Sequence, residues 1–119
     1  MVKRLAKDGS QILQELTPQK VHLWHMATGI CGEAGEILDS IKKHVAYSQQ
    51  LNSINAEGQS LVTNLIEELG DIEFYLEGLR QALSIERSET LVANKRKLFH
   101  RYPGFEYSNH AAQERKDKV

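Results

Sequence analysis

Two pairs of acidic residues are the part of this sequence best suited to chemistry. Glu33 and Glu36 stand three residues apart in Gly-Glu-Ala-Gly-Glu, and Glu68 and Asp71 repeat this spacing in Glu-Glu-Leu-Gly-Asp. Residues three apart lie on one face of a helix, so each pair places two negative charges side by side. Hard divalent cations prefer such oxygen ligands, and Mg²⁺ or Mn²⁺ fits the cluster better than zinc.

Either pair alone is more typical of a solvated helix surface, because charged side chains are common on exposed faces. Two pairs beside small residues on two adjacent helices indicate a cation site more strongly. Glu67 stands four residues before Asp71 and could replace Glu68. Glu68 is preferred because it lies closer to the apolar residues Leu65, Leu69 and Ile72 of the same helix. A di-iron site would need Glu-x-x-His on two helices. None of the five histidines has an acidic residue three positions upstream.

A basic stretch from residue 94 to 103 is the second candidate for chemistry. Asn94, Lys97 and Arg101 step by three and four residues, so they share one face of a helix. Lysine and arginine donors on one face suit phosphate oxygens. The alternative interpretation is a solvated helix end whose positive charges favour the helix dipole. Taken together, a cation cluster and a phosphate-binding face predict a triphosphate site.

The elements that position these residues are predicted to be helices. A long amphipathic helix begins at Thr17 as N-cap and Pro18 as first residue, and extends to about residue 47. A polar connector follows, over 46–59. A third helix is predicted over 86–101, with Leu91 and Leu98 inward and Pro103-Gly104 after it. The second helix is marked by an apolar seam at steps of four and three, formed by Leu65, Leu69, Ile72, Leu76, Leu79 and Leu83.

Three glycines interrupt the first long helix. Gly29, Gly32 and Gly35 each lower helix propensity by about 1 kcal/mol relative to alanine, and their spacing favours a close approach of another element on one side. Trp24 and Cys31 are predicted to belong to the core. His22 and His25 are predicted to pack or hydrogen-bond at the helix start rather than to bind metal.

The predicted fold class is all-α. Short and moderate connections between helices favour an antiparallel helical bundle. Two long helices and a shorter one make an incomplete four-helix bundle, so a homodimer is the simplest way to cover the remaining apolar surface. The predicted organisation is an N-terminal extension at 1–16 with a possible short helix, a helical domain at 17–105, and a polar tail at 106–119 that is extended or partly disordered.

Composition excludes several classes of function. The 119 residues suit one domain, and 15 basic against 16 acidic side chains lack the excess positive charge of a general nucleic-acid binder. No apolar stretch is long enough for a membrane span, and the basic N-terminus lacks the apolar core of a signal peptide. The single cysteine, Cys31, cannot form an internal disulfide. A soluble cytoplasmic protein is therefore expected.

The three blocks resemble the MazG-like branch of the all-α NTP pyrophosphohydrolases. They are Gly32 to Glu36, Glu67 to Asp71 with Tyr75-Leu76 after it, and Asn94 to Pro103, in the order typical of that family. The resemblance covers about 17–105. The family motif usually reads EExxE on one helix and ExxD on the next. Here Gly32 stands where the first glutamate often occurs, as in the GE-x-GE variants.

The resemblance implies a Mg²⁺-dependent enzyme, with Mn²⁺ as possible substitute, that converts an NTP or dNTP and water to the monophosphate and pyrophosphate. It implies an obligate dimer or dimer of dimers and a catalytic base among the glutamates, which is left unassigned between Glu33, Glu36 and Glu68. Two alternatives stay open: an inactive helical dimerisation or regulatory module, and a phosphoribosyl-ATP pyrophosphohydrolase-like enzyme. The implied metal ligands are Glu33, Glu36, Glu68 and Asp71, and the implied substrate contacts are Lys97 and Arg101 for phosphates and Asn94 for placing the nucleotide.

Overall fold

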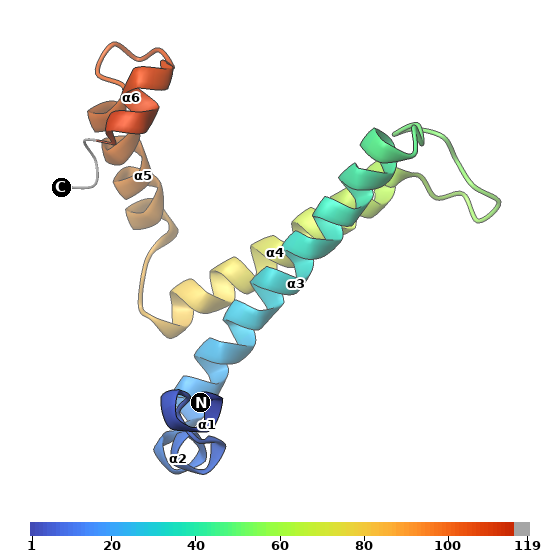
Figure 1. Cartoon of the computed structure of the whole chain (residues 1–119). Coiled ribbons are helices and arrows are strands. Elements are labelled where there is room, and N and C mark those ends of the chain that lie inside the picture. Colours follow the sequence, from blue (N-terminus) through green and yellow to red (C-terminus); the bar gives the residue numbers. More distant parts are fainter. Residues whose placement is uncertain (116–119) are drawn as a thin grey trace. The chain divides into compact units, whose positions relative to one another are not determined.

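The computed structural model describes residues 1–115 and contains helices and turns, with no strand in that range. Figure 1 shows the helices in chain order. This confirms the predicted all-α class. The helices are α1 (Val2–Leu5), α2 (Gly9–Glu15), α3 (Pro18–Ala46), α4 (Leu61–Ala82), α5 (Arg87–Arg101) and α6 (Asn109–Glu114).

The chain forms two compact units, Met1–Ala82 and Leu83–Val119. The first contains α1 to α4, and the second contains α5 and α6. Each is described by itself. The domain boundaries expected from the sequence, after residues 16 and 105, stay predictions.

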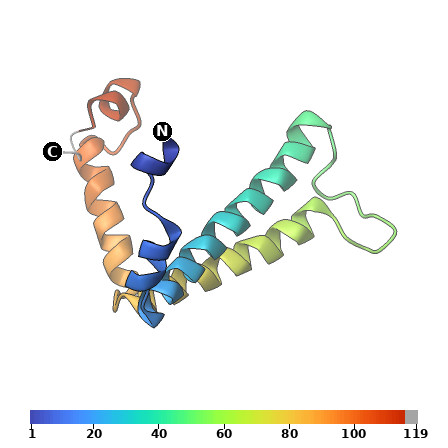
Figure 2. The same cartoon turned by 60° about the horizontal axis from the view of Figure 1, so that its bottom comes forward.

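The first unit is built on an antiparallel hairpin of α3 and α4, which lie side by side in Figures 1 and 2. The start of α3 is the predicted one. The Thr17 side chain accepts a hydrogen bond from the Lys20 backbone N–H at 3.2 Å, and Pro18 occupies the first helical position. The start of α4 is fixed by Ser60 and Thr63, because the backbone N–H of each donates to the side-chain oxygen of the other, at 2.7 and 3.2 Å.

Two glycine contacts set the register of the hairpin. The ring of Tyr75 lies directly against Gly29, and the sulfur of Met26 lies against Gly78, so that a Cβ at either glycine would overlap its neighbour. The close approach expected from the glycines of α3 therefore occurs at Gly29. At Gly32, in contrast, an added Cβ meets nothing within 4 Å, and the same holds at Gly35.

Some predicted core residues are exposed. Trp24 is 65% exposed and Cys31 is exposed, so the prediction that both belong to the core is wrong for this chain by itself. Leu69 and Leu83, at 53% and 45%, are also exposed members of the predicted seam. The physical reason is that each helix of a two-helix hairpin can bury one narrow face against its neighbour. Apolar side chains to either side of that line stay in contact with solvent.

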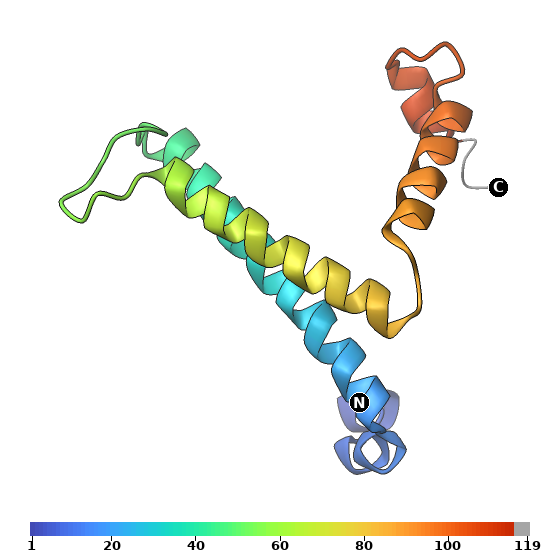
Figure 3. The same ribbon diagram turned by 180° about the vertical axis from the view of Figure 1, so that it is seen from behind.

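In the second unit α5 packs against α6, and an aromatic contact joins α5 to the segment that connects the two helices. Figure 3 shows these two helices from behind. Phe99 and Phe105 meet edge to face with ring centroids 4.9 Å apart. Ser108 caps α6 by accepting from the Ala111 backbone N–H at 3.0 Å. The prediction of an extended tail is thus wrong over Asn109–Glu114, since a capped helix forms there. Residues 116–119 of the predicted tail lie outside the described range.

Helix α5 begins at Arg87, one residue after the predicted start, and ends at Arg101 as expected. Its predicted inward residues Leu91 and Leu98 are 53% and 39% exposed. That prediction is also wrong for this unit by itself, because α6 is too short to cover the apolar face of α5. Across residues 1–115, no helix is both long and apolar enough to cross a membrane.

Candidate functional site

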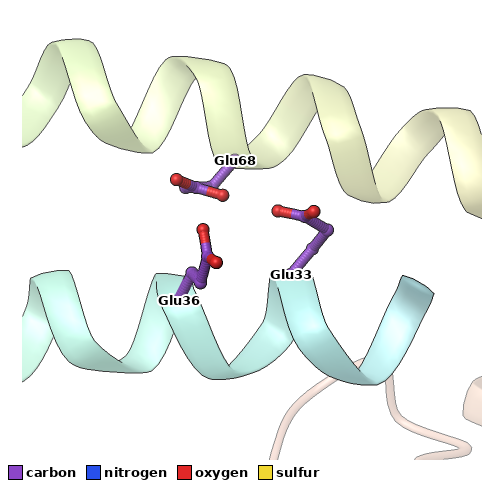
Figure 4. Close-up of side chains that lie close together, drawn as sticks. All are labelled: Glu33, Glu36 and Glu68. Atoms are coloured by element: carbon purple, nitrogen blue, oxygen red, sulfur yellow. The ribbon is translucent and has the colours of Figure 1, made fainter. Parts of the chain in front are cut away.

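Three glutamates converge between α3 and α4. Figure 4 shows the carboxylates of Glu33 and Glu36 on α3 and of Glu68 on α4 directed into the space between the two helices. One oxygen from each can be chosen so that all three atoms lie within 4.8 Å of one another. Glu33 and Glu68 are half-buried, and Glu36 is exposed. Such a set of carboxylate oxygens is suited to one hard divalent cation.

The register of the hairpin explains why these residues meet. The helices run antiparallel, and Gly29 faces Tyr75. Moving one turn along α3 and one turn back along α4 brings Glu33 level with Asp71. Three residues further, Glu36 is level with Glu68. The glycine contact on one turn therefore positions the carboxylates on the next.

The other acidic candidates lie at the edge of the cluster or outside it. Asp71 is not one of the three clustered residues, although its charge acts on both Glu36 and Glu68. Asp71 as a fourth ligand stays a prediction. Glu67 is exposed and stands outside the cluster, so the geometry favours Glu68 of the two alternatives.

The cluster is short of positive partners within the described residues. Oε2 of Glu33 and Oε2 of Glu68 are sheltered from solvent and have no hydrogen-bond partner. Across residues 1–115, no lysine, arginine or histidine forms an ion pair with these carboxylates. A sheltered carboxylate oxygen without a partner is costly, so the donor set fits a cation.

Contacts among the carboxyl groups raise the pKa values of Glu36 and Glu68. The pKa of Glu36 is raised above its ordinary value, chiefly by a hydrogen bond to Glu68 and then by the negative charge of Glu68. The pKa of Glu68 is raised chiefly by a hydrogen bond to Glu33, with desolvation and the charges of Glu33 and Asp71 acting in the same direction. The hydrogen bond to Glu36 opposes this rise. A proton or a cation therefore stabilises the cluster.

The basic candidates lie on α5 in the second unit. Asn94 and Lys97 are exposed and Arg101 is half-buried, at the helical spacing predicted from the sequence. Lys95, on another face, has its ammonium group 5.3 Å from the centroid of the Phe99 ring. A shared site for these side chains and the glutamates stays a prediction.

Sequence reasoning missed a recess on the hairpin that combines Phe74 with Glu77 and Gln81. The signal for it was present, because Phe74 lies outside the apolar seam and a small residue, Gly78, stands one turn after it. At the same end of the hairpin, His25 packs edge to face on Tyr75 with centroids 6.1 Å apart. This agrees with the prediction that His25 packs, and the expectation that it does not bind metal stays a prediction.

Comparison of the chain with known protein families, with curated proteins and with solved structures finds no match.

Proposed function

We propose that this protein is a Mg²⁺-dependent nucleoside triphosphate pyrophosphohydrolase. The reaction adds water to an NTP or dNTP and releases the monophosphate and pyrophosphate. The observation that carries the proposal is the convergence of Glu33, Glu36 and Glu68, with one oxygen from each within 4.8 Å of the others and two sheltered oxygens without partners. The resemblance of the acidic and basic blocks to MazG-like enzymes supports the same activity.

The carboxylates would serve two purposes. Glu33, Glu36 and Glu68 would hold Mg²⁺, with Asp71 beside them, and Mn²⁺ would substitute for it. The bound cation supplies charge neutralisation for the triphosphate and makes a water molecule more acidic. One of Glu33, Glu36 and Glu68 accepts the proton of the attacking water. The water oxygen bonds to the α-phosphorus, the bond from that phosphorus to the bridging oxygen breaks, and pyrophosphate leaves.

Side chains of α5 would hold the phosphates. Lys97 and Arg101 share a helical face, and their donors suit phosphate oxygens, while Asn94 on the same face would help to place the nucleotide. Within the proposal, the acidic cluster and the basic face act on opposite charges of one ligand. The carboxylates would bind Mg²⁺, and the side chains of Lys97 and Arg101 would bind the phosphates.

A direct test is release of pyrophosphate from a mixture of canonical and deoxy nucleoside triphosphates with Mg²⁺. Wild-type protein should release pyrophosphate, and chelation of the metal should stop it. Glu68→Gln should lose the activity, whereas Glu67→Gln changes the adjacent, exposed glutamate and should keep it. No pyrophosphate from any nucleotide in the wild-type protein would favour the alternative of an inactive dimerisation or regulatory module.

We also propose that a second copy of the chain covers the hairpin. Apolar residues are exposed on both long helices, and the described part of the chain buries few large side chains. An apolar surface of this kind is unusual for a monomer and is typical of a subunit interface. Sedimentation should therefore show a homodimer or a dimer of dimers at micromolar concentration, and a stable monomer of 13.5 kDa would contradict this. The exposed residues include Trp24, Leu38, Val45, Ile66 and Leu69.

A further inference from the structure

A recess of about 500 Å³ opens on the hairpin, toward the start of α3 and the end of α4. Met26 and Gly78 form its floor, where the methionine sulfur lies against the glycine. Phe74 lines the recess and is 67% exposed, so its ring is open to a ligand. An exposed ring beside an apolar floor offers a surface on which a flat heterocycle can stack.

Glu77 and Gln81 line the recess and are joined by a hydrogen bond, and Arg80 next to them also bonds to Glu77. Arg80 donates from Nε to Oε2 of Glu77 at 3.0 Å, and its side chain is 13% exposed. Gln81 donates from Nε2 to Oε1 of Glu77 at 3.2 Å. A carboxylate accepts and cannot donate, so the amide nitrogen of Gln81 must face Glu77. The carbonyl oxygen of Gln81 is then an acceptor that this bond to Glu77 does not use.

Met26 of the recess and Glu33 of the carboxylate cluster share one face of α3. Met26 precedes Glu33 by seven residues, which is about 10 Å along a helix that rises about 1.5 Å per residue. A nucleotide extends over a similar length from its phosphates to its base. Both features belong to the same compact unit, and the register that brings Met26 to Gly78 also brings Glu36 to Glu68.

We propose that this recess binds the base of the nucleotide whose phosphates meet the carboxylate cluster, and that it selects bases with an exocyclic amino group. The inference rests on the proposed hydrolysis of nucleoside triphosphates and names the substrate class of that site. Phe74 stacks on the base. The carbonyl oxygen of Gln81, held by Glu77, accepts a hydrogen bond from the amino group. A carbonyl at that position of the base would meet another acceptor and be disfavoured.

Binding of non-hydrolysable α,β-methylene triphosphates, measured by calorimetry on the full chain with Mg²⁺, separates the base contacts from catalysis. Two pairs differ in the amino group: cytidine against uridine, and adenosine against inosine. The amino member of each pair should bind about tenfold more tightly, and Gln81→Leu should remove this preference. Phe74→Ala should weaken every base by about ten- to a hundredfold, the effect of losing one stacking contact.

Matched controls come from the opposite end of the hairpin. Tyr47 is also 67% exposed, so Tyr47→Ala removes an equally exposed ring, and Gln59→Leu removes an exposed glutamine. Both should bind all four nucleotides as the wild type does. Equal wild-type affinity within both pairs would overturn the proposal. So would a Phe74→Ala protein that keeps its nucleotide affinity but changes its sedimentation, because a second copy of the chain would then cover the recess.

Failure of the hydrolysis proposal gives a different result. If no nucleotide is hydrolysed, but binding prefers the amino bases and depends on Gln81, the recess is assigned correctly and the activity is not. If hydrolysis occurs with the same base profile in wild type, Phe74→Ala and Gln81→Leu, the activity stands and the recess does not read the base.

Discussion

The α3–α4 hairpin and the α5–α6 unit carry opposite charges and are held together differently. In the hairpin, residues distant in sequence meet at Gly29–Tyr75 and Met26–Gly78, and the acidic cluster depends on that register. In the α5–α6 unit, the basic face of α5 comes from helical spacing within one element. The three carboxylates come together only when α3 packs against α4. The basic side chains share a face as soon as α5 forms a helix.

The largest expected effect is loss of hydrolysis when one of the proposed metal ligands is removed. Glu36→Ala and Asp71→Ala should each lower kcat/KM by about a hundred- to ten-thousandfold, because cation binding and proton transfer depend on the same oxygens. The helical circular dichroism should be retained. Near-normal turnover of either variant at saturating Mg²⁺ would mean that the hairpin does not carry the catalytic site.

A smaller kinetic effect is expected on the basic side. Lys97→Ala and Arg101→Ala should each lower kcat/KM by about ten- to a hundredfold, since a charge-assisted hydrogen bond contributes about 1.5–3 kcal/mol. Arg101→Lys should recover part of this loss, because lysine cannot form the two-pronged contact. Steady-state kinetics measures the loss, and Mn²⁺ titration should show unchanged metal binding. Unchanged kinetics in both variants would mean that this face is a solvated helix end and does not bind the phosphates.

The contrast between the regions can be sharpened within α3 itself. Gly29→Ala should destabilise the protein by about 1–3 kcal/mol, because the new Cβ overlaps the Tyr75 ring. Gly32→Ala is the control, since its Cβ meets nothing within 4 Å and alanine favours the helix by up to about 1 kcal/mol. Urea unfolding measures both. Equal stability of the two variants would show that Gly29 does not set the register.

The smallest expected effect is a pH dependence of stability without divalent cations. The pKa values of Glu36 and Glu68 are raised in the folded protein, so the folded state binds more protons than the unfolded state above about pH 4.3. Stability from this source is present below that pH and is lost as pH rises through the raised pKa values. Urea unfolding in a chelator should show the decline, and Glu68→Gln should reduce it. If the stability of the variant falls with pH as steeply as that of the wild type, groups other than Glu68 cause the pH dependence.

Local signals allowed much of the fold to be predicted from the sequence. Thr17 and Pro18 define the start of α3, and the step of four and three defines α4, because caps and periodicity act within a few residues. The pairing of Glu33 and Glu36 followed from the same rule. Glu68 was preferred to Glu67 from its place beside the apolar seam, and the cluster geometry agrees.

Exposure could not be predicted in the same way. Trp24 and Cys31 have the residue types of a core, but whether a side chain is covered depends on which elements surround the helix. The recess was also hidden, since Phe74 and Gln81 acquire their surroundings from Met26 on the other helix. The short helix α6 was missed because its composition is polar and its stability depends on the Ser108 cap and on packing against α5.

The connector between α3 and α4 has a consequence for engineering. Its ends are held by hydrogen bonds: the Gln49 N–H donates to the Lys43 carbonyl at 3.1 Å, Ser60 caps α4, and the Val62 N–H donates to the Leu51 carbonyl at 3.1 Å. Between these points, Asn55 closes a small turn of its own by accepting from the Gln59 N–H at 2.9 Å. An inserted peptide near Gly58 would therefore lengthen a loop whose closure costs about 0.6 kcal/mol per doubling. The hairpin should accept a fluorescent or affinity tag there while the register of its helices is retained.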